Sequence, residues 1–210
     1  MSMDLFKRVT RRRVLQALAL TPVWAQVPAV YAQGAATKAE RYREVRPVQP
    51  TDNPARIEVV DFFWYGCSHC SSFAAPLAAW KKKLPADVSY RYLPVAFEPR
   101  NENHTRLFYT LHALNKVEEL HAKVFAAMHG SARQALIKPD EIADFAAANG
   151  IERKLWLDTF NSFSVQTHAK RAQQVWQGYK IEGTPTLGID GRYWTSPSIA
   201  GGGEAALKVT

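Results

Sequence analysis

A run of ten residues, RIEVVDFFWY at 56–65, is the strongest constraint that this sequence places on its own fold. Nearly every position in the run is β-branched or aromatic, which is typical of a strand that is buried on both faces of a sheet. The two cysteines of the 210-residue chain follow at once, as Cys67 and Cys70. The sequence therefore predicts a central strand that ends beside a cysteine pair of the CxxC type.

Apolar residues recur after this pair at intervals of four, three and four, which is the spacing of one helix face. These residues are Phe73, Leu77, Trp80 and Leu84. We expect Pro76 to kink this helix without ending it, because the apolar period continues beyond the proline. The segment 88–97 is strand-like again. The order of strand, helix and strand predicts a parallel crossover unit.

The middle of the chain has helical periods and no convincing strand from 103 to 179. The periodic segments are 104–116, 119–129, 139–148, 152–160 and 164–178. One of them carries its expected end signals, since Pro139 stands near its start and Asn149 and Gly150 stand at its end. About seventy residues of helix are therefore predicted between two groups of strands.

Sheet signals return in TPTLGIDGRYWT at 184–195, where Asp190 and Gly191 separate two short strand-like runs. An Asp-Gly pair in this setting predicts a two-residue hairpin loop. The fold class that we expect is α/β, with one sheet domain interrupted by an all-helical domain. The predicted boundaries are 33–100 together with 176–210 for the sheet domain, and 101–175 for the helical domain.

The first 32 residues have the order of an export signal. The basic residues Lys7, Arg8, Arg11, Arg12 and Arg13 precede an apolar stretch at 14–25 and the small-residue motif VYA at 30–32. This apolar stretch is too short for a membrane span, so an anchor is the weaker interpretation. We expect cleavage after Ala32, with Ala25 as the alternative. TRRRVL at 10–15 is similar to a twin-arginine signal, which leaves the export route open.

The net charge argues against a nucleic-acid partner once this segment is removed. Residues 1–32 hold five basic residues and one acid, so the formal charge falls from +8 by 4, to +4. We interpret KKK at 81–83 as the solvated end of a helix. Residues 33–54 mix glycine, proline, threonine and charge without a period, and they predict an extended arm.

Metal and haem sites do not fit the CxxC pair. Structural zinc takes four cysteine or histidine ligands, and haem attachment takes CxxCH. The chain has one cysteine pair, Ser71 follows Cys70, and the histidines are scattered. A purely structural disulfide is also disfavoured, because closing so short a loop stabilises little. We therefore expect neither a metal nor an organic cofactor.

The position of the pair favours redox chemistry. Cys67 falls where the buried strand ends and a helix begins, and there unpaired backbone N–H groups and the helix dipole favour a thiolate. His69, if protonated or donating a hydrogen bond, adds to this effect. Cys70 lies one turn further on, so we expect it to be more buried and to act as the resolving sulfur.

The sequence DFFWYGCSHC at 61–70, followed by a helix, an all-helical insert and GTPT at 183–186, resembles the DsbA family of periplasmic thiol:disulfide oxidoreductases. The resemblance covers about residues 40–203. It implies a thioredoxin-like α/β fold with an inserted helical domain. It also implies that Cys67 is the exposed sulfur attacked by a substrate thiolate and that Cys70 is its partner in the disulfide.

The same resemblance implies roles for the residues near the pair. His69 matches the histidine that stabilises the Cys67 thiolate. Ser68 stands where the best-known members have proline, which leaves the redox potential open. Thr184 and Pro185 match a loop with a cis proline that faces the disulfide and pairs with extended substrate.

Asp61 matches a buried acidic residue beneath the active site that relays protons to Cys70. A carboxylate in a buried strand is costly unless it has a function or a partner. The alternative for Asp61 is a position at a strand end that is exposed to water.

The activity implied is the oxidation of cysteine pairs in newly exported proteins, through a mixed disulfide at Cys67. The expected partners are those unfolded exported proteins and a quinone-linked membrane oxidase of the DsbB type, and the enzyme is expected to be a periplasmic monomer. A disulfide isomerase or reductase of the same compartment is the alternative within this chemistry. A redox-inactive peptide-binding module that uses the groove around Pro185 is the alternative from another class.

Overall fold

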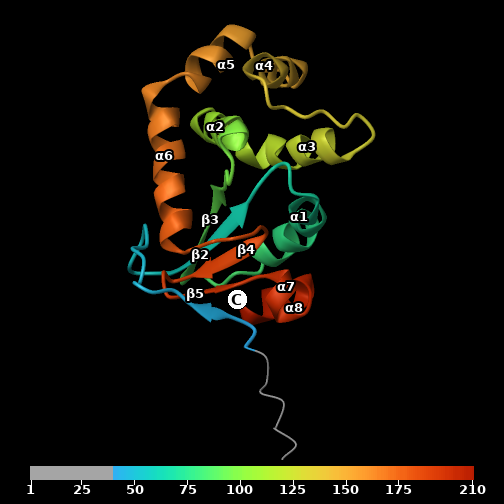
Figure 1. Ribbon diagram of the computed structural model, residues 1–210. Helices are drawn as coiled ribbons and strands as arrows, with labels where there is room; N and C mark the ends of the chain where they lie inside the picture. The colour runs from blue at the N-terminus through green and yellow to red at the C-terminus, as the bar shows by residue number, and fades with distance from the viewer. Residues whose placement is uncertain (1–39) are drawn as a thin grey trace, which may run out of the picture. The chain divides into compact units, whose positions relative to one another are not determined.

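The computed structural model describes residues 40–210 (Figure 1). The predicted export signal at 1–32, with its cleavage site, lies outside the described residues, as does the beginning of the predicted arm. Across the described 40–210, none of the helices has the length and apolar character needed to cross a membrane.

A five-stranded mixed sheet forms the lower layer of the molecule in Figure 1. Its strands are β1 (Arg43–Glu44), β2 (Ile57–Phe63), β3 (Val88–Pro94), β4 (Thr186–Ile189) and β5 (Tyr193–Thr195), in the order β1-β5-β4-β2-β3. β2 runs parallel to β3 and antiparallel to β4. The predicted buried strand is confirmed, because β2 is internal to the sheet and buried from its second residue to its last.

The helices agree closely with the predicted periods. They are α1 (Ser68–Lys81), the 3-10 turn η1 (Pro99–Asn101), α2 (Glu102–Ala113), α3 (Val117–His129), α4 (Pro139–Ala148), α5 (Arg153–Phe160), α6 (Phe163–Gly178), α7 (Pro197–Ala200) and α8 (Gly203–Val209). α1 continues through Pro76, as expected. α6 runs without a break through position 176, where a domain boundary is predicted, so those boundaries stay a prediction.

The period-two pattern of β2 divides the core between the two faces of the sheet. Val60 and Phe62 pack with Ala172 of α6 on one face. On the other face, Phe73 and Leu77 of α1 pack with Leu187 of β4. Figure 1 shows α6 on one side of the sheet, and α1 with α7 and α8 on the other.

A third cluster joins the end of β2 to the helices inserted between β3 and β4. Phe63, Tyr65 and Cys70 belong to it, together with apolar residues of α2, α3, α4 and α5. The cysteine pair is therefore held where the sheet meets the helical insert.

The hairpin between β4 and β5 differs in detail from its prediction. Asp190 and Gly191 form the turn with φ angles of 50° and 67°, and the N–H of Arg192 donates to the carbonyl of Ile189 at 3.0 Å. The strands pair Ile189 with Tyr193, however. Arg192 therefore also lies in the loop, which has three residues rather than two.

The predicted extended arm contributes a strand to the sheet. Its residues Arg43 and Glu44 form β1, which pairs antiparallel with β5. The N–H of Val45 then donates to the carbonyl of Arg192 at 2.7 Å, and the Val45 side chain is buried. A two-residue strand is too short to give a hydrophobic period, so the sequence carried no signal for it.

A buried ion pair ties the arm to β2 and β3. The Glu58 side chain is only 2% exposed, and Arg91 donates to its two oxygens from Nε at 3.0 Å and from Nη2 at 3.2 Å. The backbone N–H of Asp52 in the arm donates to the same carboxylate at 3.0 Å. This carboxylate therefore depends on protein donors in place of water.

We expect Arg91→Met to lower the free energy of unfolding by about 3–5 kcal/mol, because it leaves the Glu58 carboxylate buried without its charged partner. Urea denaturation at neutral pH measures the loss. The matched control is Arg46→Met, whose partner Glu44 is largely exposed, and we expect it to cost less than about 1 kcal/mol. Equal losses in the two variants would contradict the assigned importance of the buried pair.

Candidate active site

The turn between β2 and α1 places Cys67 at the start of the helix. The Cys67 N–H donates to the carbonyl of Trp64 at 3.0 Å and closes the turn. A β-carbon on Gly66 would clash with the Trp64 ring, so this position requires glycine unless the ring moves. The indole is itself held by a hydrogen bond of 2.8 Å from its Nε1 to Nδ1 of His104.

The sulfur of Cys67 is the N-cap of α1. It accepts a hydrogen bond from the backbone N–H of Cys70 at 3.4 Å, and its thiol donates to the carbonyl of Thr184 at 3.3 Å. Both cysteines are free thiols in the structure, with Cys67 half-buried and Cys70 buried. The expected burial of the second cysteine is confirmed.

The surroundings separate the pKa values of the two thiols. The hydrogen bond from the Cys70 side chain has the largest effect on the pKa of Cys67. The pKa of Cys67 is lowered from 9.0 to about 5, although partial burial opposes this change. The Thr184 side chain and the backbone N–H groups of Cys70 and His69 contribute to this lowering. Burial raises the pKa of Cys70 well above its ordinary value. Cys67 is therefore the thiolate of the pair at neutral pH.

Ser68 and His69, between the cysteines, are exposed. The imidazole of His69 has no hydrogen-bond partner in the part of the chain that the structure describes, and His69 favours the Cys67 thiolate through its backbone N–H. The predicted stabilisation of the thiolate by the His69 imidazole stays a prediction.

The Thr184–Pro185 peptide bond is cis, and Pro185 is buried beside the cysteine pair. Together with His69, these two residues line a groove of about 730 Å³. Its remaining walls are mainly apolar and include Phe73, Pro76, Ile181, Trp194 and Ile199. The groove thus opens at the active-site end of α1 and is suited to apolar side chains of a bound chain.

Asp61 is buried, with 3% of its side chain exposed, so the exposed alternative considered for it is wrong. Burial raises its pKa to about 7, although the hydroxyl of Tyr90, which donates to Oδ2 at 2.9 Å, and the charge of Lys81 oppose the shift. Its other oxygen, Oδ1, has no hydrogen-bond partner among residues 40–210. Asp61 and Cys70 line the same cavity of about 560 Å³.

Sequence reasoning missed the partners of this carboxyl. Tyr90 is brought to Asp61 by the parallel register that pairs Asp61 with Tyr92, and no local motif reports such a register. His121 of α3 also lines the cavity, and its Nδ1 is 2.9 Å from the Tyr65 hydroxyl. Burial lowers the pKa of His121 to about 3, so this imidazole is neutral.

The arrangement suits the exchange of a disulfide with another thiol. One sulfur is accessible and stabilised as a thiolate, and the other is buried and lines the same cavity as a carboxyl whose pKa lies near neutrality. In residues 40–210 no group of three or more histidine, cysteine or acidic side chains is placed to hold a metal ion.

Comparison with known proteins gives consistent matches over most of the chain. The model of a family described as Thioredoxin matches residues 52–208. The thiol:disulfide interchange protein DsbA of Bordetella parapertussis is 40% identical over 201 residues, covering 95% of this chain and 93% of the relative. DsbA of Pseudomonas aeruginosa is 36% identical over 173 residues, covering 82% of each chain.

Solved structures agree with these sequence matches. The crystal structure of Pseudomonas aeruginosa DsbA has a TM-score of 0.77 at 36% identity, covering 80% of this chain and 88% of the other. That of the oxidoreductase DsbA from Xylella fastidiosa has a TM-score of 0.75 at 27% identity, with 80% and 90% covered. The expected thioredoxin-like fold with a helical insert is confirmed.

We expect Cys70→Ala to raise the pKa of Cys67, because it removes the hydrogen bond that contributes most to the low value. The ultraviolet absorbance of the thiolate, followed against pH in the reduced protein, measures the shift. Ser71→Ala is the matched control, since the Ser71 hydroxyl is not among the groups that shift the pKa of Cys67, and its titration should coincide with that of the unaltered protein. A Cys67 pKa that does not change in Cys70→Ala would contradict this account.

We expect Asp61→Asn to stabilise the protein at pH 8 by roughly 2–4 kcal/mol and to give little difference near pH 4. The pKa of Asp61 is higher in the folded chain than in the unfolded chain, so its contribution to stability is present below about pH 4 and is lost as pH rises through about 7. Urea denaturation of both proteins at the two pH values measures the difference. A stability difference that is independent of pH would exclude this carboxyl as the source.

Proposed function

The chain belongs to the DsbA family of thiol:disulfide oxidoreductases, and from this membership we propose that it donates a Cys67–Cys70 disulfide to cysteine pairs of newly exported proteins. The observation that carries the proposal is the asymmetry of the pair. Cys67 is accessible at the start of a helix with a lowered pKa, whereas Cys70 is buried with a raised pKa.

The reaction proceeds through two exchanges. A substrate thiolate attacks the Cys67 sulfur, the bond between the two enzyme sulfurs breaks, and Cys70 leaves as a thiolate that takes up a proton. A second substrate thiolate then attacks the substrate sulfur of the mixed disulfide, and Cys67 leaves as a thiolate. Two electrons pass from the substrate to the enzyme, which is released as the dithiol.

The lowered pKa of Cys67 favours this direction of transfer. A thiolate that is stable at neutral pH is a good leaving group in the second exchange, and it stabilises the reduced enzyme. At pH 7 a pKa of about 5 makes the disulfide more oxidising by at most roughly 60 mV, and solvent around the half-buried sulfur reduces this figure. A reductase is disfavoured by such a shift, because a stabilised dithiol gives up its electrons less readily.

Asp61 is the proposed source of the proton that Cys70 takes up. It lines the cavity that also borders Cys70, and a pKa of about 7 leaves part of the population protonated at neutral pH. Its unpartnered Oδ1 is the atom available for that transfer, since Oδ2 is bonded to Tyr90.

The groove beside Pro185 is the proposed site for the substrate chain. His69 and Thr184 line this groove, the exposed Ser68 follows Cys67 in the chain, and the apolar walls suit the side chains of an unfolded polypeptide. In this proposal the enzyme works in the periplasm as a monomer, and a quinone-linked membrane oxidase of the DsbB type restores the disulfide. The export signal predicted at 1–32 supports that location.

We expect the oxidised protein to convert reduced, unfolded ribonuclease A to its disulfide form, with one enzyme disulfide consumed for each substrate disulfide formed. Cys67→Ser should abolish transfer. Cys70→Ser should instead accumulate a mixed disulfide at Cys67 when it is mixed with oxidised substrate, because no resolving sulfur remains. Free thiols and disulfide-linked species are counted after acid quenching.

Ser71→Ala is again the control, and it should transfer disulfides at the unaltered rate. A protein that binds reduced ribonuclease A without oxidising it would overturn the proposal in favour of a peptide-binding module. Faster repair of scrambled disulfides than formation of new ones would overturn it in favour of an isomerase.

A further inference from the structure

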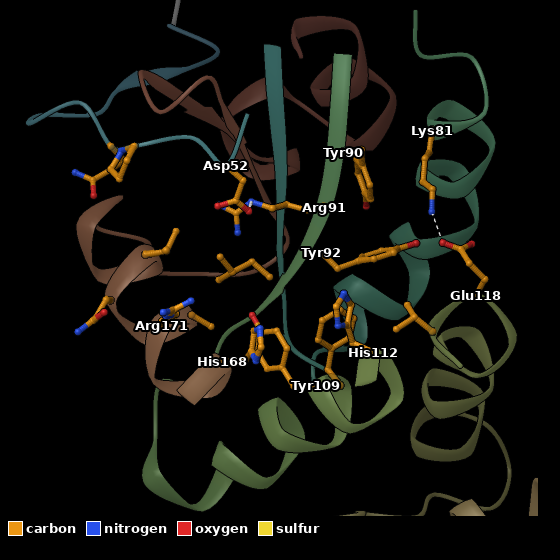
Figure 2. Close-up of a pocket in the computed structure, with 18 residues that line it drawn as sticks. Asp52, Lys81, Tyr90, Arg91, Tyr92, Tyr109, His112, Glu118, His168 and Arg171 are labelled. Carbon is orange, nitrogen blue, oxygen red and sulfur yellow. Dashed lines mark hydrogen bonds and ion pairs between the residues drawn. The ribbon is translucent and has the colours of Figure 1, made fainter. Parts of the chain in front are cut away.

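A second cleft, of about 690 Å³, runs along β3 between α1, α2 and α6 (Figure 2). Consecutive residues of β3 line it from both faces of the sheet, with Tyr90 and Tyr92 directed to one side and Arg91 to the other in Figure 2. The cleft therefore straddles the free edge of the sheet, because β3 is the last strand on that side. Neither cysteine, and no residue of the Pro185 loop, lines it.

The backbone of β3 offers unused hydrogen-bonding groups to this cleft. The carbonyl of Asp87 accepts from Ile57, and the N–H of Val95 donates to Phe63, so the odd-numbered residues of β3 face β2. The N–H and carbonyl groups of Tyr90 and Tyr92 therefore point outward. Within residues 40–210 these groups have no hydrogen-bond partner in the protein, and an edge of this kind is a template for another strand.

Basic side chains without an acidic partner stand on the helical wall of the cleft, and Arg171 is the cation among them. His168 and Arg171 lie one turn apart on α6, and the ring of His112 on α2 lies 6.3 Å from that of His168 between centroids. None of the three forms an ion pair in the described chain; the ring of His168 bonds only to Ser164 of its own helix. Figure 2 shows His112, His168 and Tyr109 gathered at the same end of the cleft.

The other charged groups of the cleft are already paired. Lys81 binds Glu118 at 2.6 Å, and Arg91 binds both Glu58 and Asp52. A negative charge in the cleft is therefore attracted mainly to the wall formed by α2 and α6. The floor beneath it is apolar and aromatic, with Leu93, Phe108 and Tyr109.

We propose that this cleft binds an extended peptide, which adds as a strand to the free edge of β3 and directs an acidic side chain to Arg171, His168 and His112. Strand addition satisfies the outward backbone groups of Tyr90 and Tyr92, and alternate peptide side chains enter the cleft on the two faces of the sheet. The charge pattern of the helical wall selects a carboxylate over a cationic side chain at that position. This site is separate from the thiol chemistry and does not require it.

The test uses two cysteine-free peptides of about eight residues, a common strand length. One alternates valine and threonine with a glutamate near its centre, and the other has lysine in place of that glutamate. Binding to the oxidised full protein is measured by isothermal calorimetry at low salt. We expect the lysine peptide to bind about tenfold more weakly than the glutamate peptide.

Charge reversal on the protein gives the reciprocal measurement. Arg171→Glu should weaken the binding of the glutamate peptide by about tenfold and strengthen the binding of the lysine peptide. Lys170→Glu is the matched control, because the neighbouring side chain is exposed outside this cleft, and it should change binding less than about twofold. Unaltered disulfide transfer by both variants verifies that they are folded.

Hydrogen exchange and backbone methylation test the strand addition itself. The glutamate peptide should slow exchange of the Tyr90 and Tyr92 amides. N-methyl groups on every second peptide residue should abolish binding where those N–H groups face β3, and methyl groups on the other set of residues should leave binding intact. The proposal is overturned if no binding is detected, if both peptides bind equally, or if exchange slows at 183–186 instead. It also fails if the two amides are already protected without peptide, since the edge is then occupied.

Discussion

The chemistry of this protein depends on the hydrogen bonds that Cys70 gives to the Cys67 sulfur, from its side chain and from its backbone N–H. In the backbone bond the sulfur takes the N-cap place of α1. In an ordinary helix this place is taken by the oxygen of a serine or aspartate, which satisfies a backbone donor at the first turn. Here the acceptor is a sulfur, and a thiolate accepts better than a thiol. The backbone bond that caps α1 therefore also favours the ionised cysteine, so the local fold and the reactivity of the site are linked.

The strand before this helix sets the second half of the mechanism. β2 alternates its side chains, so that Phe62 packs toward α6 while Asp61 and Phe63 face α1. Because the cysteines follow β2 directly, the acid on this face is brought to the cavity that also borders Cys70. A single buried strand thus supplies both the support for the sulfur and a carboxyl whose pKa is near neutrality.

The sequence predicted what is local and missed what depends on register. Hydrophobic periods located every long helix, and the composition of 56–65 identified the internal strand, because these signals are repeated over many residues. The pairing of β1 with β5 and the bond from Tyr90 to Asp61 each join segments that are far apart in sequence. The hairpin is local, but the place of Arg192 in its loop depends on the register in which β4 pairs with β5. The site residues in the CxxC turn were predicted for the same reason that the helices were, since they are neighbours in sequence.

The same topology explains why β3 keeps a free edge. The chain leaves the sheet after β3, builds five helices, and returns as β4 on the other side of β2, so no later strand reaches the outer side of β3. The inserted helices α2 and α6 instead form a wall beside that edge. The helical insertion therefore covers the cysteine end of β2. It also turns the free edge of β3 into a walled cleft with its own charge pattern.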